Sequence, residues 1–237
     1  MMTNEGDIII PDLEIMMQAK NYRRWIINKV RPYIGNRILE VGGGIGNNIE
    51  YLLDRELVVV VDNYVECGKY LRKRFNNQNI LAYTIDIADT EKIVPLLEFK
   101  FDTILCFNVL EHIEKDGIAL QNMKGLLAPD GKIVLIVPAF NFLFGGIDKA
   151  VGHKRRYTKN TLIKITQSLG LEVVTLGFMN VFGFFGWFLN NKILNRETES
   201  LSQILFFDKY IAPFSEKIER IFPLPFGLSL VGVFRKK

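Results

Sequence analysis

Short runs of apolar residues alternate with longer amphipathic segments along the first 180 residues of the chain. The apolar runs predict seven strands, near residues 37–41, 57–61, 80–85, 101–107, 131–137, 171–178 and 228–234. The amphipathic segments predict helices near 13–30, 46–54, 64–75, 89–97, 115–127 and 159–168. Thr158 is expected to cap the last of these helices and Gly170 to close it. The alternation is typical of an α/β fold in which a mostly parallel sheet carries helices on both faces.

One segment before the last predicted strand breaks this alternation. Residues 181–189 are almost entirely apolar, a polar break follows at 190–200, and apolar residues then recur at three- and four-residue spacings. Pro213 is expected to kink or divide that second run. We therefore expect an apolar helical lid over 181–224, packed over the carboxyl ends of the strands. With an N-terminal helical cap over 1–35, it would belong to a single domain spanning 1–237.

Composition narrows the class of protein. The chain has 237 residues, 49% of them hydrophobic and 24% charged, which is enough to bury a large core. Its net charge of +4 does not indicate a nucleic-acid partner, because basic residues gather only at 154–156 and 235–237. Cys67 and Cys106 form no C-x-x-C pair, and no apolar run approaches the roughly 20 residues of a bilayer span. Without a secretory signal pattern, a cytoplasmic location is expected.

Glycines are densest directly after the first predicted strand, in the sequence EVGGGIGN. Glycine allows a positive φ and lets a ligand approach the backbone closely, and the helix predicted next would offer free N–H groups. Asp62 ends the second strand, where its carboxylate can accept hydrogen bonds from ribose hydroxyls. Asn47 stands where the G-x-G-x-x-G dinucleotide fingerprint needs its third glycine. The loop therefore indicates a cofactor site that is not the standard dinucleotide type.

The spacing E-x-G-x-G-x-G, with the motifs that follow it, resembles class I methyltransferases that use S-adenosylmethionine (SAM), over about residues 36–178. The resemblance implies a Rossmann-like sheet and SAM as cofactor. It implies that Glu40 holds the methionyl amine, Asp62 the ribose, and the pair at 86–87 the adenine. The cofactor-binding residues that it implies are Glu40, Gly42, Gly43, Gly44, Gly46, Asn47, Asp62, Asn63, Tyr64, Asp86, Ile87, Asn108 and Val109.

The sequence FDTILCFNVLEHI at 101–113 looks like the fourth-strand motif of that family. Its L-E-H-I ending is similar to small-molecule methyltransferases such as the quinone-biosynthesis enzymes, and this similarity implies that His112 lies near the transferred methyl. Some quinone methyltransferases hold a divalent cation through the Glu-His pair and a carboxylate at the position of Asn108. Because asparagine stands there in this chain, no metal is expected.

The second of the two histidines, His153, lies in the sequence GHKRRY. Imidazole can take a proton near neutral pH, so His112 and His153 are the candidate catalytic bases. The alternatives are a helix-capping role for His112 and a solvated position for His153. The basic residues 154–156 are either solvated or bind an anionic group of a substrate. The candidate substrate-binding residues are Tyr22, Arg156, Tyr157 and Trp187.

These patterns together predict an enzyme that transfers the SAM methyl group to an oxygen, nitrogen or carbon of a small molecule. A non-catalytic nucleotide-binding scaffold and an NAD-dependent oxidoreductase are the alternatives on the same fold. A nucleic-acid methyltransferase is disfavoured, because the chain lacks an N/D-P-P-Y-type motif and an extended basic face. The oligomeric state stays open.

The composition of the lid bears on the acceptor. Its aromatic residues suggest a lipid-linked acceptor and peripheral membrane contact, or else they pack inward as a pocket wall. The basic residues of the lid are Lys192, Arg196, Lys209, Lys217 and Arg220, and its acidic residues are Glu197, Glu199, Asp208, Glu216 and Glu219. The acidic residues dilute the positive charge that would favour a membrane.

Overall fold

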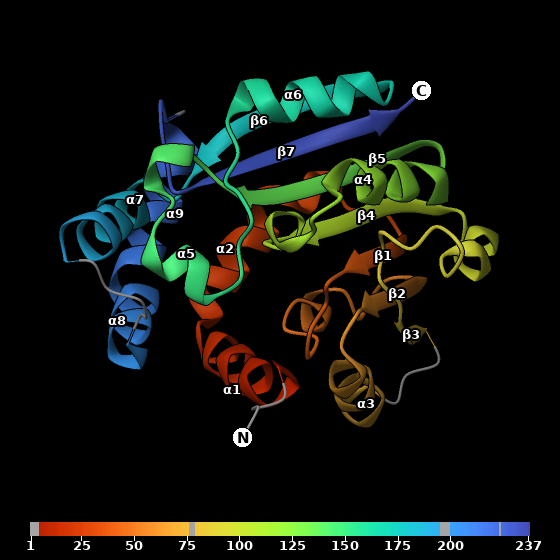
Figure 1. Ribbon diagram of the computed structural model, residues 1–237, viewed down its shortest axis with the longest axis horizontal. Helices are drawn as coiled ribbons and strands as arrows, with labels where there is room; N and C mark the ends of the chain where they lie inside the picture. Colours follow the sequence, from red (N-terminus) through yellow and green to blue (C-terminus); the bar gives the residue numbers. More distant parts are fainter. Residues whose placement is uncertain (1–4, 76–78, 195–199, 223) are drawn as a thin grey trace.

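The computed structural model describes residues 5–75, 79–194, 200–222 and 224–237 and contains one seven-stranded sheet (Figure 1). Its strands are β1 (Arg37–Val41), β2 (Leu57–Asp62), β3 (Ile80–Thr84), β4 (Phe101–Phe107), β5 (Leu127–Pro138), β6 (Leu171–Met179) and β7 (Ser229–Lys236). They lie in the order β3-β2-β1-β4-β5-β7-β6. Strands β1 to β5 pair in parallel, and β7 runs antiparallel to β5 and β6. The prediction of a mostly parallel seven-stranded sheet is confirmed.

Side chains alternate between two cores, one on each face of the sheet. Leu39 and Val41 of β1 pack with residues of α4 (Asp116–Leu126) and α6 (Lys159–Ser168). Ile38, on the opposite face, packs with residues of α2 (Lys20–Val30), α3 (Val65–Arg74) and α9 (Ala212–Ile221). Because successive strand residues point to opposite faces, the nearly continuous apolar sequence of these strands is what a sheet covered on both sides requires.

The expected helices 64–75, 115–127 and 159–168 are present as α3, α4 and α6. Thr158 caps α6, since its side chain accepts a hydrogen bond from the Thr161 N–H, and Gly170 follows with a φ of 69°. The single helix expected at 13–30 is instead two, α1 (Glu5–Gln18) and α2, separated at Ala19, whose φ and ψ of −78° and 62° are not helical.

Two expected helices are wrong. Residues 46–54 form turns and the 3-10 helix η2 (Ile49–Tyr51), and 89–97 form turns that lead into η3 (Val94–Phe99). Gly46 has a φ of 81°, which interrupts a right-handed helix at its start. The Asn47 side chain donates to the Leu13 carbonyl, and that of Asn48 donates to Glu40. Both amides therefore tie the loop to distant parts of the chain instead of capping a local helix.

The segment before β7 is helical, as expected. It contains α7 (Val181–Phe188), the π-turn η6 (Leu189–Ile193), α8 (Leu201–Phe206), a second π-turn η7 (Phe207–Ile211), and α9. Pro213 lies in the first turn of α9, directly after η7, and the backbone stays helical from α8 through η7 into α9. In Figure 1, α7, α8 and α9 lie together at one end of the sheet. None of the helices within the described ranges is both long and apolar enough to cross a bilayer.

The side on which successive strands are added to the sheet switches between β1 and β4, although the two strands run parallel. From β1 the chain builds outward to β2 and β3, and it then returns to build the other half of the sheet from β4. In open α/β sheets the loops diverge at such a point and leave a crevice at the carboxyl ends of the strands. The elements η1 (Arg31–Tyr33), η4 (Leu110–His112), η5 (Asn141–Leu143) and α5 (Gly146–Ala150) complete the described structure.

Candidate active site

A cavity of about 1360 Å³ lies at this switch point. Loops after β1, β2, β3 and β4 line one side of it, and α1, α2, α7, α8 and η7 contribute to the other. The expected site residues that line it are Tyr22, Gly42, Gly44, Asp62, Asn63, Tyr64, Asp86, Ile87, Asn108, Val109, His112, His153, Arg156 and Trp187. Pockets for one drug-sized ligand measure roughly 300–1,000 Å³. The cavity therefore has room for a cofactor together with a second molecule.

Two glycines of the loop after β1 line this cavity, Gly42 with a φ of 66° and Gly44 with a φ of 53°. A Cβ on Gly42 would collide with the Val109 side chain, and one on Gly44 would lie 3.0 Å from the Leu13 side chain. Gly46 is needed for packing within the protein, because a Cβ there would collide with the Leu71 and Phe75 side chains. Gly43 and Gly46 shape the loop from behind and do not line the cavity, and neither does Asn47.

Asp62 holds the glycine loop in place. Its Oδ2 accepts a hydrogen bond from the Gly44 N–H at 2.9 Å, and its Oδ1 accepts one from the Tyr64 N–H at 3.0 Å. Burial raises the pKa of this carboxyl, and the backbone hydrogen bonds oppose that rise. Each oxygen keeps a further lone pair, so the carboxylate can also accept hydrogen bonds from a ligand in the cavity.

Glu40 lies behind the loop and does not line the cavity. Its Oε1 accepts a hydrogen bond from Asn48 Nδ2 at 2.9 Å, whereas its Oε2 is buried without a hydrogen-bond partner in the described part of the chain. Burial raises the pKa of Glu40 to about 7, and the charge of Asp62 adds to the rise. A buried carboxylate oxygen that lacks a donor is costly and fits a cationic or N–H donor supplied from outside the protein.

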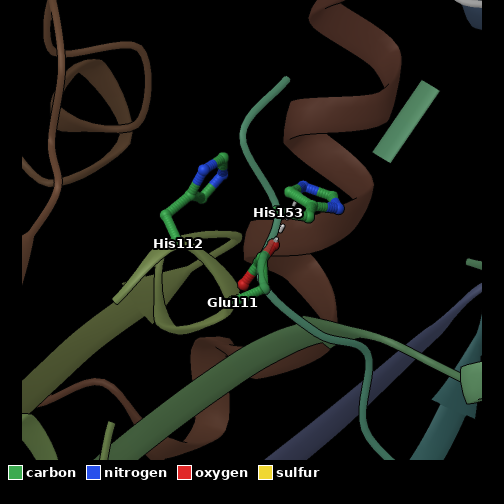
Figure 2. A group of neighbouring side chains, drawn as sticks. All are labelled: Glu111, His112 and His153. Carbon is green, nitrogen blue, oxygen red and sulfur yellow. Dashed lines mark ion pairs between the residues drawn. The ribbon is translucent and has the colours of Figure 1, made fainter. Parts of the chain in front are cut away.

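The two histidines come from separate loops and meet at the cavity (Figure 2). Their ring centroids are 4.7 Å apart, and His153 Nε2 lies 3.8 Å from Oε1 of the fully buried Glu111. The surrounding protein lowers the pKa of His112 to about 4 by partial desolvation, with the His153 ring acting in the same direction, although the residue remains exposed at the cavity. Burial raises the pKa of Glu111 to about 8. The expected role of the histidines in proton removal stays a prediction.

Asp148 anchors the second of these loops, and nothing in the sequence marks its role except its place five residues before His153. Its Oδ1 accepts hydrogen bonds from His153 Nδ1 at 2.8 Å and from Arg156 Nε at 2.7 Å. Its Oδ2 accepts from the Gly145 N–H at 3.0 Å and from Asn191 Nδ2 at 3.1 Å. Asp148 is fully buried, so this network fixes the histidine and the arginine in one arrangement.

Arg156 and Trp187 meet across the cavity wall. The Arg156 guanidinium lies 4.7 Å from the centre of the Trp187 ring and also donates to the Ala139 carbonyl at 3.2 Å. It is buried, so it is not the solvated loop cation considered from the sequence. The Trp187 Nε1–H is buried and has no hydrogen-bond partner within the described chain, which leaves a donor free at the cavity.

Tyr157 does not fit its expected role in substrate binding. The side chain lies in the core beneath the cavity, 3% exposed, and it does not line the cavity. Its hydroxyl donates to Asp116 Oδ2 at 2.8 Å, and the Leu110 carbonyl oxygen is a second, longer acceptor at 3.3 Å. Alternation along the chain explains the difference, because Arg156 and Tyr157 are adjacent and point to opposite sides.

From the sequence, Asp208 is only one of the acidic residues of the lid. In the structure it is also part of the site. It lines the cavity, and its Oδ1 accepts a hydrogen bond from the Tyr22 N–H at 2.8 Å. Its Oδ2 accepts from Asn21 Nδ2 at 3.2 Å. The carboxylate therefore connects the segment before β7 to the start of α2, beside Tyr22.

Comparisons with known proteins agree with this architecture. The chain is 30% identical over 151 residues to the mitochondrial methyltransferase OMS1 of Saccharomyces cerevisiae, which covers 56% of this chain and 31% of that protein. It spans no more than 31% of the length of the curated relatives that it matches.

Solved structures share the fold at low sequence identity. A Haloferax volcanii methyltransferase, solved in complex with the activator Trm112, superimposes with a TM-score of 0.68 at 14% identity, over 99% of both chains. The N-methyltransferase NodS of Bradyrhizobium japonicum, solved with S-adenosyl-L-homocysteine (SAH), gives 0.57 at 17% identity, over 92% of this chain and 86% of that one.

The sequence family described as methyltransferase domain matches residues 21–176. These residues include the glycine loop, Asp62 and the loop after β4, which are the parts of the fold that line the cavity. The cofactor that the resemblance implied, SAM, is the cofactor of this family. The chain belongs to the SAM-dependent methyltransferases.

Proposed function

We propose that this methyltransferase acts on an apolar or lipid-linked small molecule that enters the cavity beside the cofactor. The main support for this proposal is that one continuous cavity is lined both by the expected cofactor residues and by apolar residues of 181–211, among them Phe182, Ile204 and Phe206. Family membership favours this function over the oxidoreductase and the scaffold that the sequence also allowed.

The residues around the loop after β1 fit SAM, and we propose their roles accordingly. The unpartnered Oε2 of Glu40, behind the loop, suits an ammonium group that reaches it past Gly42 and Gly44, and Asp62 is available to ribose hydroxyls. Asp86 and Ile87 would flank the adenine, with Asn63, Tyr64, Asn108 and Val109 along the adenosine and Gly42 and Gly44 against the methionyl part. When bound, SAM would supply a methyl group activated by its attachment to a sulfonium.

The protein then has to align the acceptor and exclude water. Trp187 and Tyr22 supply an aromatic wall to the cavity, and Arg156, packed against Trp187, fixes the orientation of the indole. The free Nε1–H of Trp187 can donate a hydrogen bond to a polar atom of the acceptor. His112 and His153 lie on the same cavity, where we place the reacting end of the acceptor.

The outer surface of the 181–222 segment supports delivery of the acceptor from a membrane. Its exposed apolar side chains are Phe185, Phe188, Leu189, Ile193, Leu194, Leu201, Leu205, Phe206, Tyr210, Phe214, Ile221 and Phe222. Two acidic residues of the segment, Asp208 and Glu219, are buried, whereas its basic residues Lys192, Lys209, Lys217 and Arg220 are exposed. The exposed surface is therefore more positive than the sequence alone suggests, which favours anionic membranes. Arg196, Glu197 and Glu199 lie outside the described residues.

Methyl transfer can be tested with SAM carrying a deuterated methyl group. The purified protein is incubated with this SAM and with lipid and aqueous extracts separately, and the products are examined by mass spectrometry. Labelled product from the lipid extract is the expected result. Label that appears in the aqueous extract alone would reject the apolar acceptor while leaving the transferase activity in place.

Membrane contact is tested by co-sedimentation with anionic vesicles. We expect the wild type to pellet and the Phe185→Ser/Phe214→Ser double variant to stay in the supernatant, because both rings are exposed, at 56% and 55%, and neither lines the cavity. Val94→Ser is the matched control, since Val94 is exposed on η3, in a different part of the fold. A wild type that does not sediment would remove the membrane from the proposal.

A further inference from the structure

Three side chains with metal-ligating atoms converge on the cavity beneath the 181–222 segment. Glu111 and His112 come from η4, after β4, and His153 comes from the loop after α5 (Figure 2). One ligand atom from each lies within 4.8 Å of the others. All three residues line the cavity, so a group that they bound would be accessible to molecules within it.

Glu111 is the member of this group that most needs a partner. It is fully buried, and neither of its carboxylate oxygens has a hydrogen-bond partner among the described residues. Its own backbone N–H and the Arg156 guanidinium favour the charged form, but the side-chain hydrogen bonds of that guanidinium go to Asp148 and to the Ala139 carbonyl. A buried carboxylate without a donor is rare in native structures, because its desolvation is not offset. A cation between Glu111 and the histidines would offset it.

The orientation of His153 is fixed in the manner of a metal ligand. Its Nδ1 is held by Asp148 at 2.8 Å, so its Nε2 is directed toward Glu111, 3.8 Å away. A carboxylate that binds the second ring nitrogen is the usual outer partner of a metal-binding histidine, because it sets the tautomer and the ring position. Asp148 is itself fixed by Gly145 and Asn191, so the ring is positioned before any ligand arrives.

We propose that Glu111, His112 and His153 bind a divalent transition-metal ion such as Zn²⁺ or Co²⁺, with Asp148 as the residue that positions His153. In a tetrahedral site with bonds of about 2.0–2.1 Å, neighbouring ligand atoms lie roughly 3.3–3.4 Å apart, so the separations of up to 4.8 Å between these ligand atoms close by small side-chain rotations. Two imidazole nitrogens and one carboxylate oxygen suit these ions better than Ca²⁺ or Mg²⁺.

The ligand set differs from the one that the sequence resemblance raised. Asn108 takes no part in it, and the third ligand comes from a loop about 40 residues further along, which the sequence could not place beside η4. The coordination positions left open face the cavity, where an oxygen atom of the acceptor can complete the site. That last step rests on the proposed methyl transfer, whereas metal binding itself does not.

The test uses full-length protein without a histidine tag, stripped of metal by dialysis against a chelator. Titration with Co²⁺ is followed by visible absorption, and titration with Zn²⁺ by calorimetry. We expect saturation at one ion per chain. We also expect an intense visible absorption band of Co²⁺, which is typical of a low coordination number with nitrogen and oxygen ligands. Asp148→Asn should lower the affinity by about 10–100-fold, the usual effect of an outer partner, and should alter the Co²⁺ spectrum.

His153→Ala and Glu111→Gln should each weaken binding by more than Asp148→Asn does. Glu114→Gln is the matched control, because it removes the same charge from an exposed side chain on the same cavity, and it should bind as the wild type does. Circular dichroism and SAH binding show whether each variant is folded. If Glu111→Gln does not fold, His153→Ala decides alone.

Two results would overturn the proposal: no saturable binding of either ion to the wild type, or wild-type affinity in His153→Ala. SAH binding by metal-free protein keeps this outcome separate from the proposed function. If the protein binds SAH but no metal, only the proposed metal site is rejected. A chain that binds metal but neither SAH nor SAM would instead count against the proposed methyl transfer.

Discussion

Glu40 should make the stability of the cofactor-free protein depend on pH. The pKa of Glu40 is about 7 in the folded chain, against 4.5 for an ordinary glutamate, because the side chain is buried and 3% exposed. The folded state therefore holds this proton more tightly than the unfolded state does. Its contribution is fully present below pH 4.5 and is lost as the pH rises to about 7.

The size of this loss follows from the shift. About 2.5 pH units at roughly 1.36 kcal/mol each give about 3 kcal/mol, as an upper value. Glu40→Gln keeps the shape of the side chain and the acceptor for Asn48 Nδ2, but it cannot ionise. The variant should therefore lose less stability than the wild type between pH 5 and pH 8, by up to about 3 kcal/mol.

Urea unfolding at several pH values, without cofactor, measures the difference. Glu56→Gln is the control, since the Glu56 side chain is 60% exposed and pairs with Arg37 at the surface. SAH titrations should show a second effect: affinity in the wild type rises with pH toward neutrality, as the carboxylate forms to receive the amine, and Glu40→Gln loses this rise. Parallel stability curves for Glu40→Gln and the wild type would refute the reasoning.

Other variants distinguish residues that bind the cofactor from residues that stabilise the fold. Asp62→Asn should weaken SAH binding by about 1.5–3 kcal/mol, measured by calorimetry, because it removes a charged acceptor; an unchanged affinity would exclude its ribose role. Gly44→Val should weaken binding further, since φ is 53° there, and a dissociation constant like that of the wild type would count against the loop as the methionyl site. Tyr157→Phe should lower the free energy of unfolding by about 1 kcal/mol through the lost bond to Asp116, without affecting SAH binding. Thr158→Ala should cost about 1 kcal/mol of stability in urea unfolding as the α6 cap is lost, and no change would contradict the cap.

Local patterns predicted most of the fold. Strand positions follow from short apolar runs, and the ends of α6 follow from Thr158 and Gly170, because these signals act through neighbouring residues. Of the two helices predicted wrongly, the one at 46–54 lies where contacts with other parts of the chain outweigh local preference, whereas at 89–97 the Asp89 side chain binds the N–H groups of Glu91 and Lys92 in a local turn. In the first of them, Asn47 and Asn48 bind Leu13 and Glu40.

The sequence by itself determined the family, the mostly parallel sheet expected of that family, and the residue types around the cofactor, whereas the order of the strands came from the structure. Only the tertiary structure decided which neighbours share a cavity: Arg156 faces it, whereas Tyr157 lies in the core beside it. It also decided that Asp148 holds His153 against Glu111. The physical reason is that motif spacing along one strand or turn is local, whereas the meeting of two loops depends on how the sheet and its helices pack. No spacing in the sequence records that packing.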